Sequence, residues 1–250
     1  MAVEVLAPDA AQRRARAQEL LNGRSLLVGG FAQAHSSRFE PEVFERYVML
    51  AMEFGATHIG VGWLPFQYGT WYLPDNSDPY TSWSNGSLGL FRVFPPEALQ
   101  PWISRESAQP LQQIIETQIG ILRKYGLKGK VSGCEPMWLP EAVYEAHPHW
   151  RGPQCELTRI ARRPYFAPSI DEPEVLELYR EAVGEIARRF PEIDYLGFLG
   201  NDSGAGISWS PCLYPGMNGP TKWRMRDPGE RIANWLNAMQ EGAAAEGVEM

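Results

Sequence analysis

Residues 126–136, GLKGKVSGCEP, contain the pattern on which the fold prediction rests. Gly126 follows a stretch with helical periodicity, and glycine is common just after the end of a helix. Residues 127–133 then read as a short strand, and Cys134-Glu135-Pro136 comes directly after it. A long irregular stretch, residues 137–170, follows. The segment therefore predicts a strand with a tight turn before it and a long loop after it.

The order of short turn, strand and long irregular stretch recurs along the chain. Between the strands, apolar residues are spaced three to four apart, as in amphipathic helices. Pro41 and Asp227-Pro228 suit helix starts, where proline needs no backbone partner. A further helix opens at Asp171 and Pro173, and residues 248–250 resemble the start of a fifth strand. The strands are predicted at residues 25–31, 57–63, 127–133 and 194–200.

Alternation of strands and helices predicts an α/β fold with a parallel sheet and right-handed crossovers. The long irregular stretches, residues 64–108, 137–170 and 201–226, all follow strands, whereas the helix-to-strand turns are short. That asymmetry is typical of a (β/α) TIM-type barrel. A doubly wound sheet is the alternative, but Gly29-Gly30 does not form the phosphate-binding GxGxxG pattern.

We therefore predict one barrel-type domain over residues 1–250. It would be the N-terminal half of a barrel, with four to five βα units, continued by strands beyond Met250. Because half a barrel leaves edge strands unpaired, we expect little activity from these 250 residues alone.

The net charge, the apolar runs and the cysteines of the chain argue against several classes of partner and site. The net charge is −7, which argues against a nucleic-acid-binding surface. No apolar run approaches the ~20 residues of a membrane span, so no membrane partner is predicted. The three cysteines are distant in sequence and odd in number, which favours neither a disulfide framework nor a zinc site. A reducing, cytoplasmic location is the simplest prediction, and the oligomeric state is left open.

Two carboxylates follow predicted strands. Asp202 lies in residues 201–206, NDSGAG, directly after the fourth strand, where barrel enzymes place acid/base groups. Its alternative role is to cap backbone amides in a turn. Glu135 follows the third strand, and its alternative role is a salt bridge to Arg or Lys. Together they would supply the carboxylate pair that glycoside hydrolysis needs.

Aromatic residues make up 12% of the chain, including nine Trp, and many lie in the irregular stretches. Their rings could stack on sugars, or the loops could fold over their own aromatic core. In the HPHWRGP motif, a lone HxH is weak evidence for a metal, so loop packing or substrate contact is favoured there. Arg151 could pair with a carboxylate of the protein or of a ligand. The expected aromatic platform is Trp63, Tyr68, Trp71, Trp209 and Tyr214, and the expected polar contacts are His35, His149, Arg151, Asn201 and Asn218.

Residues 197–206 (GFLGNDSGAG) and 213–220 (LYPGMNGP), with CEP and HPHWRGP before them, resemble the barrel of the α-glucuronidase-like glycoside hydrolases. The resemblance covers about residues 127–220. It implies a TIM barrel and a glutamate general acid after the strand. This chain departs from that pattern, with Asp202 in the segment and Gly204-Ala205 where the glutamate is expected. The family's basic residues and further carboxylates would lie on later strands.

We therefore predict a glycoside-hydrolase-like protein acting on an oligo- or polysaccharide, such as a plant- or microbe-derived fragment. Asp202 is the leading catalytic carboxylate and Glu135 the second, and the chemistry needs neither cofactor nor metal. One alternative is a non-catalytic carbohydrate-binding protein on a barrel scaffold. Another is a barrel enzyme of different chemistry, such as a metal-dependent hydrolase or an isomerase, because barrels host many reactions.

Overall fold

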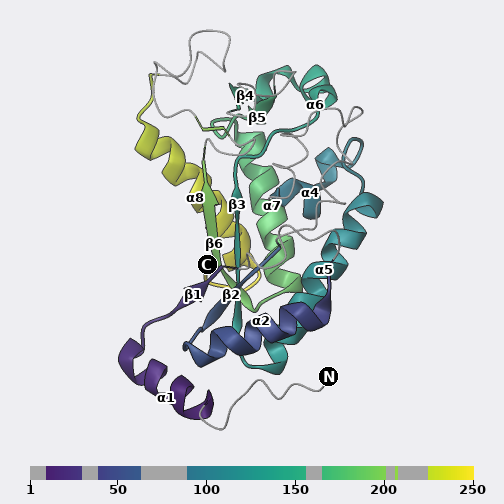
Figure 1. Cartoon of the computed structure of the whole chain (residues 1–250). Helices are drawn as coiled ribbons and strands as arrows, with labels where there is room; N and C mark the ends of the chain where they lie inside the picture. The colour runs from purple at the N-terminus through teal and green to yellow at the C-terminus, as the bar shows by residue number, and fades with distance from the viewer. Residues whose placement is uncertain (1–9, 30–38, 63–88, 156–164, 201–205, 208–224) are drawn as a thin grey trace.

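A computed structural model of the chain describes residues 10–29, 39–62, 89–155, 165–200, 206–207 and 225–250. Its main sheet has four strands in the order β1-β2-β3-β6, and every neighbouring pair is parallel (Figure 1). All four predicted strands are confirmed, as is the parallel sheet. The strands are β1 Leu27–Val28, β2 His58–Val61, β3 Lys128–Cys134 and β6 Ile193–Leu199.

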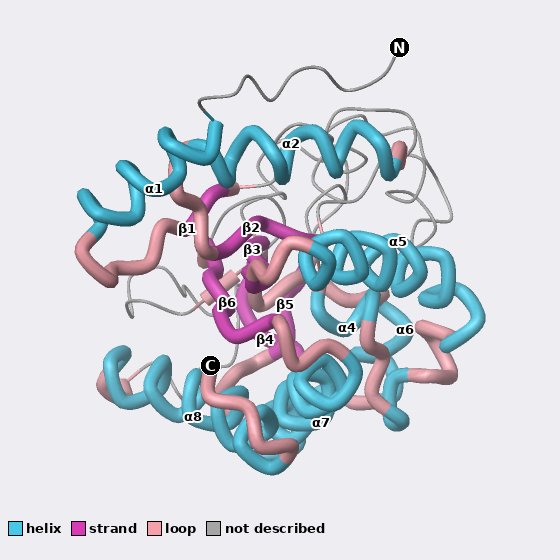
Figure 2. The backbone as a smooth tube through the Cα atoms, turned by 90° about the horizontal axis from the view of Figure 1, so that it is seen from below, coloured by secondary structure: helices cyan, strands magenta, loops and turns pink. Residues whose placement is uncertain are grey.

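The long helices alternate with these strands along the chain, as predicted. Figure 2 shows α2, α5, α7 and α8 arranged around the strands, with α1 beside α2. The Asp227 side chain caps α8 by accepting from the Glu230 amide at 2.9 Å, and Gly126 ends the segment after α5 with a φ of 65°. The bounds are α1 Ala10–Leu21, α2 Pro41–Glu53, α5 Arg105–Lys124, α7 Pro173–Arg189 and α8 Pro228–Ala245.

Two sequence expectations need correction. The stretches predicted as irregular contain short elements, including an antiparallel pair of strands, because elements of three to six residues show no measurable period. Residues 248–250, predicted to begin a fifth strand, are not a strand, since no described segment pairs with the free edge of β6. The short elements are α4 Leu90–Val93, η3 Glu97–Leu99, α6 Glu141–Ala146, η4 Pro148–Trp150, β4 Arg151–Gln154 and β5 Phe166–Pro168.

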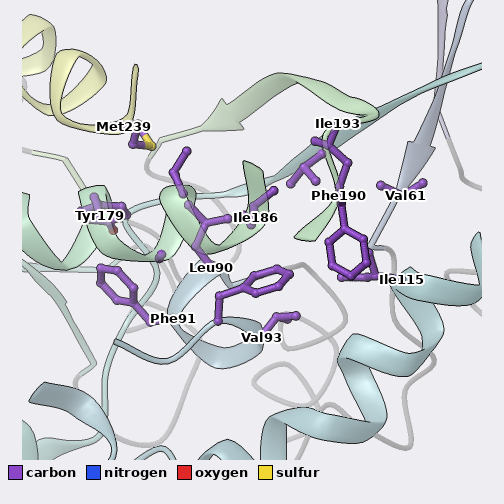
Figure 3. Packing of buried hydrophobic residues seen from close by; sticks show 14 of the residues in the cluster. Val61, Leu90, Phe91, Val93, Ile115, Tyr179, Ile186, Phe190, Ile193 and Met239 are labelled. Atoms are coloured by element: carbon purple, nitrogen blue, oxygen red, sulfur yellow. The ribbon is translucent and has the colours of Figure 1, made fainter. Parts of the chain in front are cut away.

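The core lies between the sheet and the surrounding helices. Ile59, Val61 and Val131 point from β2 and β3 into it, and each is fully buried. The short helix α4 contacts both α5 and α7, so Leu90 and Phe91 pack among the apolar side chains of the longer helices (Figure 3). None of the described helices combines the length and apolar character that a bilayer span requires.

Parallel pairing places the carboxyl ends of all four strands at one edge of the sheet. In Figure 1, β4, β5 and α6 lie at the end of the molecule opposite α1. These three elements belong to the connection that follows β3. The described elements of the connection after β3 therefore lie at the end of the sheet where Glu135 follows the strand.

Candidate active site around Glu135

Glu135 is the first residue after β3, and its side chain is only 1% exposed. Its backbone amide donates to the Leu199 carbonyl at 3.2 Å, which extends the pairing of β3 with β6 by one residue. Pro136 follows, and its carbonyl accepts from the Gly206 amide at 3.0 Å. The chain therefore returns to this point of the sheet after β6 has ended.

Three donors surround the Glu135 carboxyl group. Oε1 accepts from the Leu90 amide at 2.6 Å, and Oε2 accepts from the Met137 amide at 2.8 Å and from the Tyr179 hydroxyl at 2.9 Å. Leu90 is the first residue of α4, so its amide has no partner within the helix. Tyr179 lies on the face of α7 that packs against the core. Glu135 thus joins segments that follow β2, β3 and β5 in sequence.

Burial raises the pKa of Glu135 to about 7, and the hydrogen bonds from Leu90, Met137 and Tyr179 act in the opposite direction. A carboxyl group of this kind is partly protonated at neutral pH and suits general acid catalysis. The alternative role expected for Glu135 was a salt bridge to Arg or Lys. The partners observed are instead two backbone amides and a tyrosine.

The raised pKa makes a prediction for stability. A group with a higher pKa in the folded state stabilises the fold below its unfolded pKa, and that contribution is lost as pH rises. For Glu135 the loss should fall between pH 4.5 and about 7 and amount to about 3 kcal/mol. Glu135→Gln stays neutral, so the difference in unfolding free energy between wild type and variant should change by this amount across that window. Urea denaturation at several pH values measures it, and a constant difference would contradict the raised pKa.

Two predicted polar contacts lie in the connection after β3. Arg151 pairs with both carboxylate oxygens of Glu141, and its guanidinium lies 5.1 Å from the Tyr144 ring centroid and 4.7 Å from that of Phe166. Its expected carboxylate partner is thus found within the protein. These contacts hold the start of β4 against α6 and β5.

His149 belongs to an aromatic cluster in the same connection. Its Nε2 lies 2.6 Å from Glu174 Oε2, which also accepts from the Trp150 indole at 2.5 Å. Both bonds lower the pKa of Glu174, and the bond from Trp150 has the larger effect. The His147 ring stacks on Trp150 with centroids 3.9 Å apart. Among the described residues, no group of three or more His, Cys, Asp or Glu could hold a metal ion.

The remaining predicted site residues lie outside the described residues, and their arrangement around Glu135 stays a prediction. Asp202 belongs to residues 201–205, which lie in the connection between Leu199 and Gly206. Both of those flanking positions are hydrogen-bonded to the Glu135-Pro136 backbone. The others are His35, Trp63, Tyr68, Trp71, Asn201, Trp209, Tyr214 and Asn218.

No family model and no curated protein matches this chain. The interpretation of the site therefore depends on its own geometry. That geometry includes three donors that were not predicted as site residues, Leu90, Met137 and Tyr179. Tyr179 lies on the buried face of α7. A tyrosine on a buried helix face usually has a partner for its hydroxyl, and this signal could have identified it.

Proposed function

We propose that this protein is a glycoside-hydrolase-like protein acting on an oligo- or polysaccharide, with Glu135 as the proton donor. The observation that supports it most is a buried carboxyl group at the carboxyl end of a parallel strand, where burial raises the pKa of Glu135 to about 7. A second carboxylate, Asp202, belongs to a segment whose flanking residues bond to the Glu135-Pro136 backbone. The sequence predicts the same pair of residues, but with Asp202 as the leading carboxylate and Glu135 as the second.

In the proposed reaction, protonated Glu135 transfers its proton to the leaving-group oxygen of the glycosidic bond. Ionised Asp202 attacks the sugar or activates the water that does so. A separation of about 5–5.5 Å between the carboxyl groups would suit a retaining reaction, and roughly 6.5–9.5 Å an inverting one. The aromatic residues of the long connections would stack on the sugar rings, and no cofactor takes part.

The proposal extends to the fold. The strands follow one another across the sheet in chain order, and the long helices lie around them. We take this as half of a (β/α) barrel, which further βα units would complete. A cytoplasmic location remains part of the proposal.

A second candidate is a non-catalytic carbohydrate-binding protein on the same scaffold. It is favoured by the burial of Glu135, which is 1% exposed and accepts three hydrogen bonds. A carboxyl group held in this way can serve to fix three chain segments at the end of the sheet. The aromatic platform would then bind sugar without a productive acid.

The two candidates differ in turnover. In the protein at its full natural length, we expect hydrolysis of p-nitrophenyl α-D-glucuronide or of glucuronoxylan oligosaccharides. Glu135→Gln and Asp202→Asn should each lower kcat by about 100-fold or more, because neither amide can replace its carboxyl group in the reaction. Binding, measured by quenching of tryptophan fluorescence, should persist in both variants. Glu116→Gln, on the exposed face of α5, is the matched control and should keep the wild-type kcat.

Each other outcome is decisive. If the wild-type protein binds the sugars but does not hydrolyse them, the non-catalytic candidate is supported. Near-normal kcat in Glu135→Gln would remove Glu135 from the mechanism and leave it a structural role. A protein that neither binds nor cleaves these sugars would contradict both candidates.

A further inference from the structure

The two oxygens of Glu135 differ in their surroundings. Oε2 accepts two hydrogen bonds, from the Met137 amide and the Tyr179 hydroxyl, whereas Oε1 accepts one, from the Leu90 amide. Each carboxylate oxygen has room for about two hydrogen-bond partners. Oε2 is therefore fully occupied, and among the residues that the structure describes no second partner bonds to Oε1.

We propose that Tyr179 is a positioning residue that keeps Oε2 unprotonated and thereby places the transferable proton of Glu135 on Oε1. This inference rests on the proposed role of Glu135 as a proton donor. A proton on Oε2 would have to displace either the Met137 amide or the Tyr179 hydroxyl. A proton on Oε1 displaces nothing, because the Leu90 amide occupies only one of its two positions.

The packing of Tyr179 suits this role. The side chain is fully buried, and its ring lies between Phe91 of α4, with centroids 4.4 Å apart, and Trp235 of α8, at 5.5 Å. Figure 3 shows the Phe91 ring beside Tyr179, and the two ring planes are tilted by 43°. Contacts from two helices hold the ring in place, so its hydroxyl is fixed relative to the end of β3.

The charge state of Tyr179 is also fixed. Burial, with the neighbouring charge of Glu135, raises the pKa of Tyr179 well above its usual value, so its hydroxyl stays protonated and donates. The other titratable groups that act on it are Tyr144 of α6 and Cys155, which follows β4. Burial raises the pKa of both well above the usual range, so both stay neutral at physiological pH. Arg92 of α4 is the buried cation nearest in sequence to Leu90.

The test compares Tyr179→Phe with Tyr144→Phe. Both tyrosines are almost fully buried and lose only a hydroxyl group, but Tyr144 donates to the Phe166 carbonyl at 2.7 Å rather than to Glu135. Carbon-13 NMR of the glutamate carboxyl groups, with the Glu135 signal assigned by its loss in Glu135→Gln, gives the pKa. Tyr179→Phe should raise it by about one to two pH units, because the ionised form loses a donor. Tyr144→Phe should leave it unchanged.

A second readout locates the proton. With the proton on Oε1, the carbonyl is C=Oε2, which accepts two hydrogen bonds. Its infrared stretching frequency, taken from the difference spectrum against Glu135→Gln at low pH, should rise in Tyr179→Phe and stay constant in Tyr144→Phe. An unchanged frequency or pKa in Tyr179→Phe would overturn the inference, and so would equal shifts in the two variants.

Failure of the proposed function would look different. In an active protein at full natural length, turnover should fall as pH rises through the pKa of the acid. In Tyr179→Phe, this fall in turnover should occur at a higher pH, shifted by the same amount as the pKa measured by NMR. If both spectroscopic shifts occur but the wild type shows no turnover, Tyr179 still sets the protonation of Glu135, and only the hydrolase proposal fails.

Discussion

Gly242→Ala is expected to lower the free energy of unfolding by about 3 kcal/mol or more. Gly242 lies where α8 packs against α7. A Cβ atom there would lie 3.0 Å from the Arg180 carbonyl carbon and closer still to its oxygen. Both are backbone atoms of α7, so the clash is relieved only if the two helices separate. Separation would open the packing around Tyr179 and Trp235, which join the same two helices.

The matched control is Gly120→Ala on the exposed side of α5. A Cβ atom at Gly120 would meet nothing within 4 Å. Alanine also costs less conformational entropy than glycine in a helix, so this variant should gain about 0.5–1 kcal/mol. Urea denaturation measures both variants. Equal stability of Gly242→Ala and Gly120→Ala would show that α7 and α8 do not approach so closely.

Asp171→Asn is expected to cost about 3–5 kcal/mol, because it removes a negative charge that pairs with the buried Arg231 guanidinium. Asp171 comes just before α7, and Arg231 lies in the first turn of α8. Arg231 Nε lies 2.5 Å from Asp171 Oδ1, and Arg231 Nη2 lies 2.5 Å from Asp171 Oδ2, so the pairing is bidentate. The two side chains are 3% and 2% exposed, Arg231 first.

A surface pair between the same helices provides the control. Arg180 of α7 lies 2.6 Å from Glu241 of α8, with side chains 36% and 60% exposed. Because water screens such pairs, Glu241→Gln should cost no more than about 1 kcal/mol. Added salt should reduce that cost but leave the cost of Asp171→Asn nearly unchanged. If the two variants cost the same, Asp171 and Arg231 are not a buried pair.

The long elements were predictable from the sequence because local signals mark their ends. Pro41, Pro173 and Pro228 each stand at the start of a helix, and Gly55 and Gly126 follow helix ends with positive φ. The apolar residues between them repeat every three to four positions, which indicates which face is buried. The antiparallel strands β4 and β5 have no such marks, because they are held by pairing with each other.

The site was predictable only in part. Glu135 was identified because it directly follows a strand. Its partners Leu90 and Tyr179 lie 45 and 44 residues away in sequence, and no local pattern connects them to it. The ion pair of Asp171 and Arg231 spans 60 residues and was missed for the same reason. Interactions of this range arise from how the helices pack, which a single sequence does not reveal.

The three donors to Glu135 come from three separate parts of the chain, and this has a thermodynamic consequence. The proton affinity of Glu135 depends on how closely Leu90, Met137 and Tyr179 approach it. By linkage, the protein should take up or release a fraction of a proton at neutral pH when it binds a ligand that moves one of these segments. The hydrogen ion therefore acts as a second ligand of the protein, and its uptake reports the relative position of α4, β3 and α7.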